Sequence, residues 1–150
     1  GRTLVLNAGQ AVDRVGVAMG LKFPAGAELE KLALKSQKVF KPKPCVKGTD
    51  CCLSGIENKC LDMIKSGEEQ CDIALYCLDS VSAALEKMTK NILGKYGDLP
   101  LVFAGGVMSN SIIRQRCTKE FGAYFAEPAF SADNAAGTAY LTYLREQKNA

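Results

Sequence analysis

The sequence predicts a single α/β domain, and the pattern near its C-terminal end is the main reason. Residues 101–104 form an apolar, partly β-branched run that stops at two glycines, as a buried strand entering a tight turn does. A helical pattern follows over residues 110–121, and a second short run at 124–126 leads into a final helical pattern. Strands that alternate with helices at this spacing pair in parallel through crossover helices.

The turn after residues 101–104 is the most informative feature of the chain. Gly105 and Gly106 lack a Cβ, so the backbone there can take a positive φ or lie close to a ligand. Asn110 is a favourable helix N-cap, and the free N–H groups of a first helical turn attract phosphate. We therefore expect a nucleotide or a phosphate over the strand end. A plain packing turn, with Asn110 serving as a cap, is the alternative.

The rest of the chain is predicted to be mainly helical. The longest helical pattern places its apolar residues on one face, and the acidic Asp72 and Asp79 fall off that face. Residues 45–53 are expected to form an extended segment or a hairpin, followed by a helix that ends near Ser66. The other helices are expected over residues 8–20, 27–35, 69–96 and 133–146.

Length and composition fit one soluble globular domain. With 150 residues the chain can bury one sizeable core, and it is 47% apolar and 23% charged. No run of about 18 apolar residues could cross a bilayer, and the start of the chain does not resemble a signal peptide. A cytoplasmic protein with no membrane partner is the resulting expectation.

Seven cysteines and no histidine argue against the usual zinc and disulfide frameworks. The number of cysteines is odd, and no C-x-x-C pair occurs. We expect reduced, mostly buried thiols that act as small hydrophobic residues. The reactivity of the adjacent Cys51 and Cys52 is left open.

Between Lys31 and Gly48 there are six lysines and no acidic residue, in a chain whose net charge is +3. A strip of this kind can face the phosphates of an RNA. A solvated helix end and loop is the favoured interpretation, because Phe40 is the one aromatic residue among the lysines.

Five short segments, in chain order, match a set of motifs that is specific when taken together. Residues 9–14 read G-Q-A-V-D-R against the pattern G-E-A-F-D-K, and residues 19–26 read M-G-L-K-F-P-A-G against L-G-L-x-Y-P-G-G. Residues 53–56 read L-S-G-I against F-S-G-L, residues 104–114 follow A-G-G-V-x-x-N-x-x-L-R, and residues 132–136 read A-D-N-A-A against T-D-N-x-A. In these segments the chain resembles the C-terminal half of the TsaD or Gcp family of tRNA threonylcarbamoyladenosine transferases, formerly described as O-sialoglycoprotein endopeptidases.

The resemblance implies an actin/hexokinase/Hsp70-like ATPase fold, of which this chain would be the C-terminal lobe with the N-terminal lobe absent. In that fold an adenine nucleotide, either ATP or an acyl-adenylate, lies between two lobes. The residues that the resemblance assigns to nucleotide binding are Asp13, Gly26, Gly105, Gly106 and Asn110. A carboxylate can accept hydrogen bonds from ribose hydroxyls, and glycine permits close approach. For Asp13 the alternative is a solvated helix position.

Asp133 is the metal ligand that the resemblance implies for this lobe, since a hard oxygen anion suits a divalent ion beside phosphates. The family's two histidine ligands belong to an H-x-x-x-H motif in the N-terminal lobe, and this chain has no histidine. An iron, zinc or magnesium ion is therefore expected only with that lobe, and the chain alone is expected to be inactive. The alternative role for Asp133 is that of a helix N-cap.

Three positions depart from the family motifs. Gln10 stands where the family has glutamate, Ala25 where it has glycine, and Glu57 where it has lysine. A reversed charge in a cleft weakens the binding of an anion there. These changes indicate a divergent paralogue.

The first functional hypothesis is the nucleotide-facing half of a metal- and ATP-dependent tRNA threonylcarbamoyl transferase-like protein, and the alternative is a non-catalytic nucleotide-binding or dimerisation paralogue. The glycoprotease activity formerly attributed to the family is disfavoured, because the chain has no H-E-x-x-H motif and no Ser, His and Asp set. Expected partners are the N-terminal lobe of the parent protein, a second copy of the chain and tRNA. The apolar helix faces expected to associate carry Val12, Val15 and Met19, or Val81, Leu85 and Met88.

Overall fold

The computed structural model describes residues 6–130 and 135–149 of the chain. The helices and the hairpin predicted within these residues are confirmed, with bounds that shift by a few residues. The elements follow one another in the order α1 (Ala8–Ala18), α2 (Gly26–Ala33), β1 (Cys45–Lys47), β2 (Asp50–Cys52), α3 (Ser54–Lys65), α4 (Gln70–Tyr96), β3 (Val102–Phe103), η1 (Gly106–Ser109), α5 (Ser111–Phe121), β4 (Tyr124–Phe125), η2 (Pro128–Phe130) and α6 (Ala135–Asn149).

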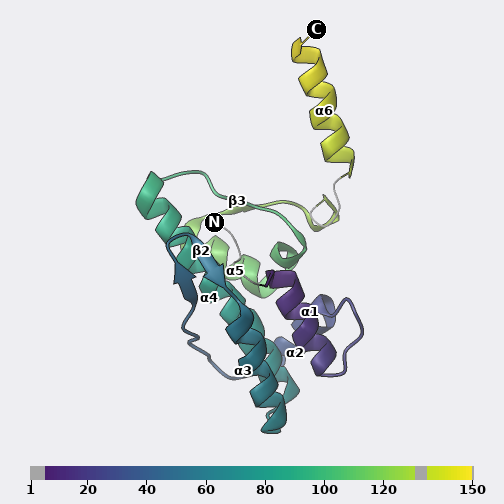
Figure 1. The fold of residues 1–150 in the computed structure, drawn as a ribbon, viewed down its shortest axis with the longest axis vertical. Helices are drawn as coiled ribbons and strands as arrows, with labels where there is room; N and C mark the ends of the chain where they lie inside the picture. Colours follow the sequence, from purple (N-terminus) through teal and green to yellow (C-terminus); the bar gives the residue numbers. More distant parts are fainter. Residues whose placement is uncertain (1–5, 131–134, 150) are drawn as a thin grey trace.

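The long helix α4 is the centre of the fold, and α1, α2, α3 and α5 all pack against it (Figure 1). Its side chains Ile73, Leu78 and Val81 are almost completely buried. Because neighbours cover α4 on several sides, the expected polar side is covered as well. The prediction that Asp72 and Asp79 lie off the buried face is therefore wrong, since both are buried.

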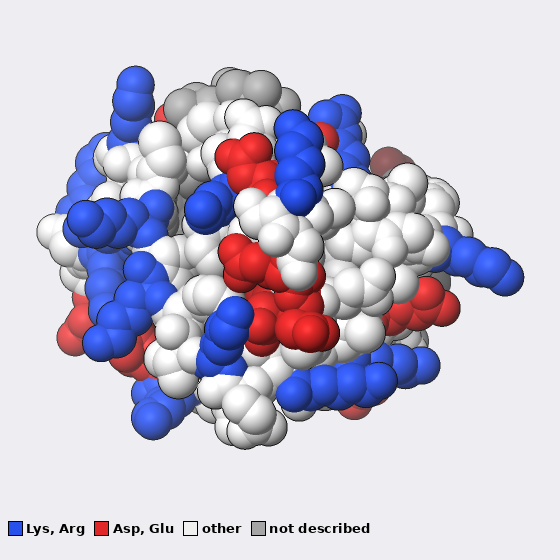
Figure 2. Space-filling view, turned by 90° about the horizontal axis from the view of Figure 1, so that it is seen from below, with Lys and Arg blue, Asp and Glu red and all other residues white. Residues whose placement is uncertain are grey.

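Asp72 is held by the loop that follows α2. The Ser36 hydroxyl donates to its Oδ1 at 2.6 Å, and Lys38 Nζ lies 2.7 Å from its Oδ2. These two partners, Lys38 first, hold the pKa of Asp72 below its ordinary value. Lys38 also lies 3.8 Å from Glu68, so one exposed lysine of the basic segment pairs with acidic residues of the chain itself. Figure 2 shows the molecule from below, with acidic side chains gathered near the middle and lysines and arginines around them.

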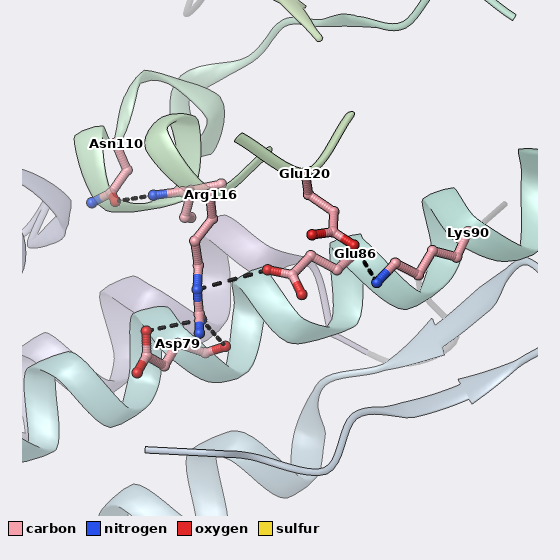
Figure 3. Close-up of polar contacts among 7 residues, drawn as sticks. Asp79, Glu86, Lys90, Asn110, Arg116 and Glu120 are labelled. Atoms are coloured by element: carbon pink, nitrogen blue, oxygen red, sulfur yellow. Dashed lines mark hydrogen bonds and ion pairs between the residues drawn. The ribbon is translucent and has the colours of Figure 1, made fainter. Parts of the chain in front are cut away.

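Asp79 belongs to a polar network that joins α4 to α5 (Figure 3). Arg116 of α5 lies 3.0 Å from Asp79 Oδ1 and 3.7 Å from Glu86 Oε1, and Lys90 pairs with Glu120 nearby. Burial raises the pKa of Asp79, and the attraction of Arg116 opposes this only in part. The network links α5 to α4, alongside Ile113 and Cys117, which pack α5 into the core.

The contributions of Asp72 and Asp79 to the free energy of unfolding should change with pH in opposite directions. At pH 7 we expect Asp72→Asn to lower the free energy of unfolding, because the lowered pKa of Asp72 makes its charged form stabilising. That contribution is present above the unfolded-state pKa of about 3.9 and is lost as the pH falls through the folded-state value. The pKa of Asp79 is raised in the folded state, so its ionised form destabilises the fold as the pH rises. Asp79→Asn should therefore lower the free energy of unfolding less at pH 7 than at pH 4. Urea unfolding from about pH 2 to pH 7 covers both titrations, since Asp72 titrates below about pH 4. Equal slopes for the two variants would contradict the assignment.

The strand pair β3 and β4 is parallel, with Val102 opposite Tyr124 and Phe103 opposite Phe125, and α5 is the crossover between them. The predicted strand–helix–strand unit is therefore confirmed. The rings of Phe103 and Phe125 stack with centroids 5.3 Å apart on the inner side. On the other face Val102 is 71% exposed and Tyr124 69% exposed. The fold is α/β, yet each sheet within the described residues has two strands and helices dominate.

The helix faces expected to associate are already covered. Val12, Val15, Met19 and Val81 are buried in the core, while Leu85 and Met88 pack against it. The prediction that these faces are open is therefore wrong, because the helices pack on one another inside the chain. Exposed apolar side chains occur instead on α6, which extends away from the other helices (Figure 1), and they include Tyr140, Leu141 and Tyr143.

All seven cysteines are free thiols in this structure. Four of them are buried, namely Cys51, Cys60, Cys77 and Cys117. None of the helices in the described part of the chain is long and apolar enough to span a membrane.

Candidate functional site

The segments that contain the predicted nucleotide residues lie next to one another, on or beside α1 and α2. A Cβ built on Gly9 of α1 would lie 3.7 Å from Val107 in η1, so these two segments are in close contact. Glu30 of α2 reaches the first residue of α5, where the N–H of Ser111 donates to its Oε1 at 2.8 Å. The Ser111 hydroxyl donates to the same oxygen. The turn after β3 is thus placed beside α1 and α2 by contacts that span up to 98 residues of chain.

The side chain of Asp13 holds the backbone at the N-terminus of α2. Its Oδ1 accepts a hydrogen bond from the Ala25 N–H at 2.8 Å, directly before Gly26 begins the helix. The carboxylate is half-buried and positions the backbone around Gly26, so Asp13 is not simply a solvated helix residue. A Cβ built on Gly26 would make an ordinary contact of 3.9 Å with Val12.

The two glycine positions after β3 differ in whether the backbone conformation requires glycine. Gly105 has φ +110°, a conformation that L side chains rarely adopt, so the backbone itself calls for glycine there. Gly106 has no positive φ, and a Cβ built on it would meet no described heavy atom within 4 Å. Packing within the described chain therefore does not explain Gly106. The same holds for Gly55 and Gly94, so what distinguishes Gly106 is its place in the turn directly after β3.

Asn110 is the N-cap of α5, as the sequence predicts: its Oδ1 accepts from the Ile113 N–H at 3.2 Å, and the side chain is buried (Figure 3). The expected free donors at this helix end are partly occupied, because Glu30 takes the Ser111 N–H. A carboxylate of the chain itself thus lies where a phosphate was expected. Glu30 was not predicted, since nothing in the sequence distinguishes it from other exposed acidic helix residues.

A groove of about 450 Å³ lies beside this region, over α1 and the start of α3. Phe23, 74% exposed, forms an apolar wall. Arg14 and Glu57 form an ion pair across it, with Nη1 3.4 Å from Oε2. The charge reversal at Glu57 is therefore matched by a cation. The residues that line this groove are Gln10, Asp13, Arg14, Val17, Ala18, Phe23 and Glu57.

Of the predicted nucleotide residues, Asp13 lines this groove. Gly26 follows the residue that Asp13 binds, and Gly105, Gly106 and Asn110 lie next to α1 and α2 through η1 and Glu30. The structure thus brings the five residues to neighbouring elements, but it does not make them the walls of one enclosed pocket.

The other two departures also have local explanations. The Asn7 N–H donates to Gln10 Oε1 at 3.3 Å, so glutamine at this position accepts a bond at the start of α1 as a glutamate would. A Cβ built on Gly16 would lie 2.3 Å from the Cβ of Ala25. Alanine at position 25 is tolerated because Gly16 opposes it.

The predicted metal ligand Asp133 lies outside the described residues. Across residues 6–130 and 135–149, no group of three or more His, Cys, Asp or Glu side chains could hold a metal ion.

Comparison with known proteins agrees with the motifs. Residues 1–140 match the family model described as tRNA N6-adenosine threonylcarbamoyltransferase. The enzyme of that name from Thermococcus kodakarensis is 31% identical over 146 residues, which cover 93% of this chain and 45% of that protein. The one from Buchnera aphidicola subsp. Acyrthosiphon pisum is 35% identical over 155 residues, which cover 94% and 46%.

A probable bifunctional tRNA threonylcarbamoyladenosine biosynthesis protein from Thermoplasma acidophilum is 32% identical, and the match covers 89% of this chain and 26% of that protein. The chain spans less than half the length of these curated relatives. Because the family model covers almost the whole chain, the chain belongs to the tRNA N6-adenosine threonylcarbamoyltransferase family.

Proposed function

We propose that the chain is the nucleotide-facing C-terminal lobe of a tRNA threonylcarbamoyl transferase-like protein with an actin-like fold. The observation that supports this most is the glycine turn after β3, which lies beside α1 and α2: Gly105 has a positive φ, and a Cβ on Gly106 would meet no described atom. An adenine nucleotide, ATP or an acyl-adenylate, would lie over the end of β3. Asp13 would bind the ribose hydroxyls from the groove, with the exposed ring of Phe23 near the base.

The chain should bind such a nucleotide weakly by itself, because one lobe covers only part of the ligand. An N-terminal lobe is the proposed partner that completes the cleft. The exposed face of β3 and β4, with Val102 and Tyr124, is consistent with a sheet that continues into further structure. A metal belongs to this proposal only with the histidines of that lobe, and tRNA would bind to the assembled protein.

Replacing Asp13 with asparagine should weaken ATP binding about tenfold, which corresponds to roughly 1.4 kcal/mol for a lost charged hydrogen bond. Asparagine keeps the oxygen that accepts from the Ala25 N–H, so α2 should stay in place. NMR titration of the chain with ATP measures the affinity and maps the residues that shift. Asp98→Asn, an exposed aspartate in the turn after α4, is the matched control and should bind like the unchanged chain. Shifts confined to regions away from Asp13, Gly106 and Asn110 would contradict the proposal.

The alternative is a paralogue that binds nucleotide or dimerises without chemistry. It is favoured by Glu30, which already occupies a donor at the N-terminus of α5, and by the Arg14–Glu57 pair in the groove. The two candidates differ in the N-terminal lobe of the parent protein. An H-x-x-x-H motif there supports the enzyme, and its absence supports the binding paralogue.

A further inference from the structure

We propose that Cys45 and Cys52 form a thiol–disulfide exchange site, in which a low-molecular-weight disulfide converts the two opposed thiols into a reversible cross-strand disulfide. This inference is independent of the proposed nucleotide function. It rests on the hairpin register, on a small cavity beside the two thiols, and on the surroundings of each sulfur.

The hairpin of β1 and β2 places the two cysteines directly opposite each other. Opposed residues of an antiparallel pair have Cα atoms about 4.5–5.5 Å apart, within the 4.4–6.8 Å range of disulfides. Side chains of opposed residues lie on the same face of the hairpin. Cys51 is next to Cys52 in the chain, and it therefore points to the other face.

A cavity of about 170 Å³ borders both thiols, so a small molecule can reach them. Ser80 of α4 also lines this cavity, and its buried hydroxyl has no hydrogen-bond partner in the described chain. A buried polar group without a partner is costly, and a polar atom of an incoming molecule would satisfy it. Lys43 borders the same cavity. The surroundings therefore suit a small disulfide that has carboxylate groups.

Cys52 is the better nucleophile of the hairpin. The Ser54 hydroxyl lies 3.2 Å from its Sγ, and hydrogen bonds from Ser54 lower the pKa of Cys52 below its ordinary value. The thiolate is the form that attacks a disulfide. Burial raises the pKa of Cys51, so that thiol stays protonated and inside the core.

The exchange proceeds in two balanced steps. The Cys52 thiolate attacks one sulfur of R–S–S–R, a Cys52–S–S–R bond forms, and one R–S⁻ leaves and takes a proton from solvent. Cys45, which is exposed, loses its proton to solvent and attacks Cys52 Sγ, which expels the second R–S⁻. The two cysteines lose two electrons, and the small disulfide gains them as two thiols.

Oxidised glutathione is the probe that tests the site, and digestion followed by mass spectrometry is the measurement. Trypsin cleaves after Lys47, between the two cysteines, so a Cys45–Cys52 bond keeps the two halves of the hairpin joined. We expect this linked pair in the oxidised chain and its loss after treatment with dithiothreitol. Cys51→Ala is the matched control and should retain the link.

Variants of the two cysteines distinguish their roles. Cys45→Ser should lose the linked pair and keep glutathione on Cys52, whereas Cys52→Ser should lose the linked pair and react slowly at Cys45. The unchanged chain supplies an independent measurement, since the rate of glutathione uptake can be mapped for every cysteine. Uptake at Cys71 or Cys51 as fast as at Cys52, or oxidation without a linked pair, would overturn the proposal.

Discussion

Replacing Leu29 with alanine should lower the free energy of unfolding by about 2–5 kcal/mol, the range for a large-to-small change in a core. Leu29 is fully buried, and its helix α2 packs against both α1 and α4. The loss combines the transfer free energy of the removed carbons with the cost of the cavity left behind. Urea unfolding followed by circular dichroism measures the change at fixed protein concentration.

Leu34 provides the control on the same helix. It caps the C-terminus of α2 and is 62% exposed, so Leu34→Ala should change the free energy of unfolding by less than about 0.5 kcal/mol. Equal losses for the two variants would mean that α2 is not docked on α4 as the structure has it.

The elements that the sequence predicted well are those with local signals. Asn110 marks the start of α5 through its own side chain, and Gly122, in the left-handed conformation, ends that helix. The β1–β2 hairpin turns at Gly48, which has a positive φ. Such signals lie within a few residues of the feature they determine, so periodicity and cap residues are enough to find them.

Burial on α4 could not be predicted in the same way. Hydrophobic periodicity places Asp72 and Asp79 on the polar side of α4, and that side would be exposed if only one face of the helix were covered. The structure covers α4 with helices from both ends of the chain, and partners distant in sequence, Lys38 and Arg116, compensate the two charges. The number of neighbours is a property of the tertiary fold that no single segment encodes.

The same limit applies to the candidate site. The motifs singled out Asp13, Gly26, Gly105, Gly106 and Asn110, and the structure places them on neighbouring elements, but their role in nucleotide binding stays a prediction. They gave no sign of Glu30, whose role depends on the docking of α2 beside the start of α5. They also flagged Ala25 as a departure without showing what compensates it.

Gly16→Ala should destabilise the chain by about 1–3 kcal/mol, although glycine to alanine inside a helix normally stabilises it. The reason is the 2.3 Å distance between a Cβ at position 16 and the Cβ of Ala25, which no rotamer can relieve. The shift needed would also move the Ala25 N–H away from Asp13 and displace Gly26. Gly94→Ala, at an exposed position of α4 where a Cβ meets no described atom, is the matched control and should be neutral or stabilising.

The double variant Gly16→Ala/Ala25→Gly separates this steric cause from a general effect on α1. It removes one Cβ for the one it adds, and glycine is acceptable at a helix N-cap, the position of Ala25 in α2. We therefore expect the double variant to recover most of the stability that Gly16→Ala loses, with a coupling free energy of about 1–3 kcal/mol in a double-mutant cycle. Additive losses from the two single variants would show that the α1–α2 contact is looser than the structure has it. Recovery would instead explain how this chain accommodates alanine where its family has glycine, with the backbone around Asp13 and Gly26 kept in place.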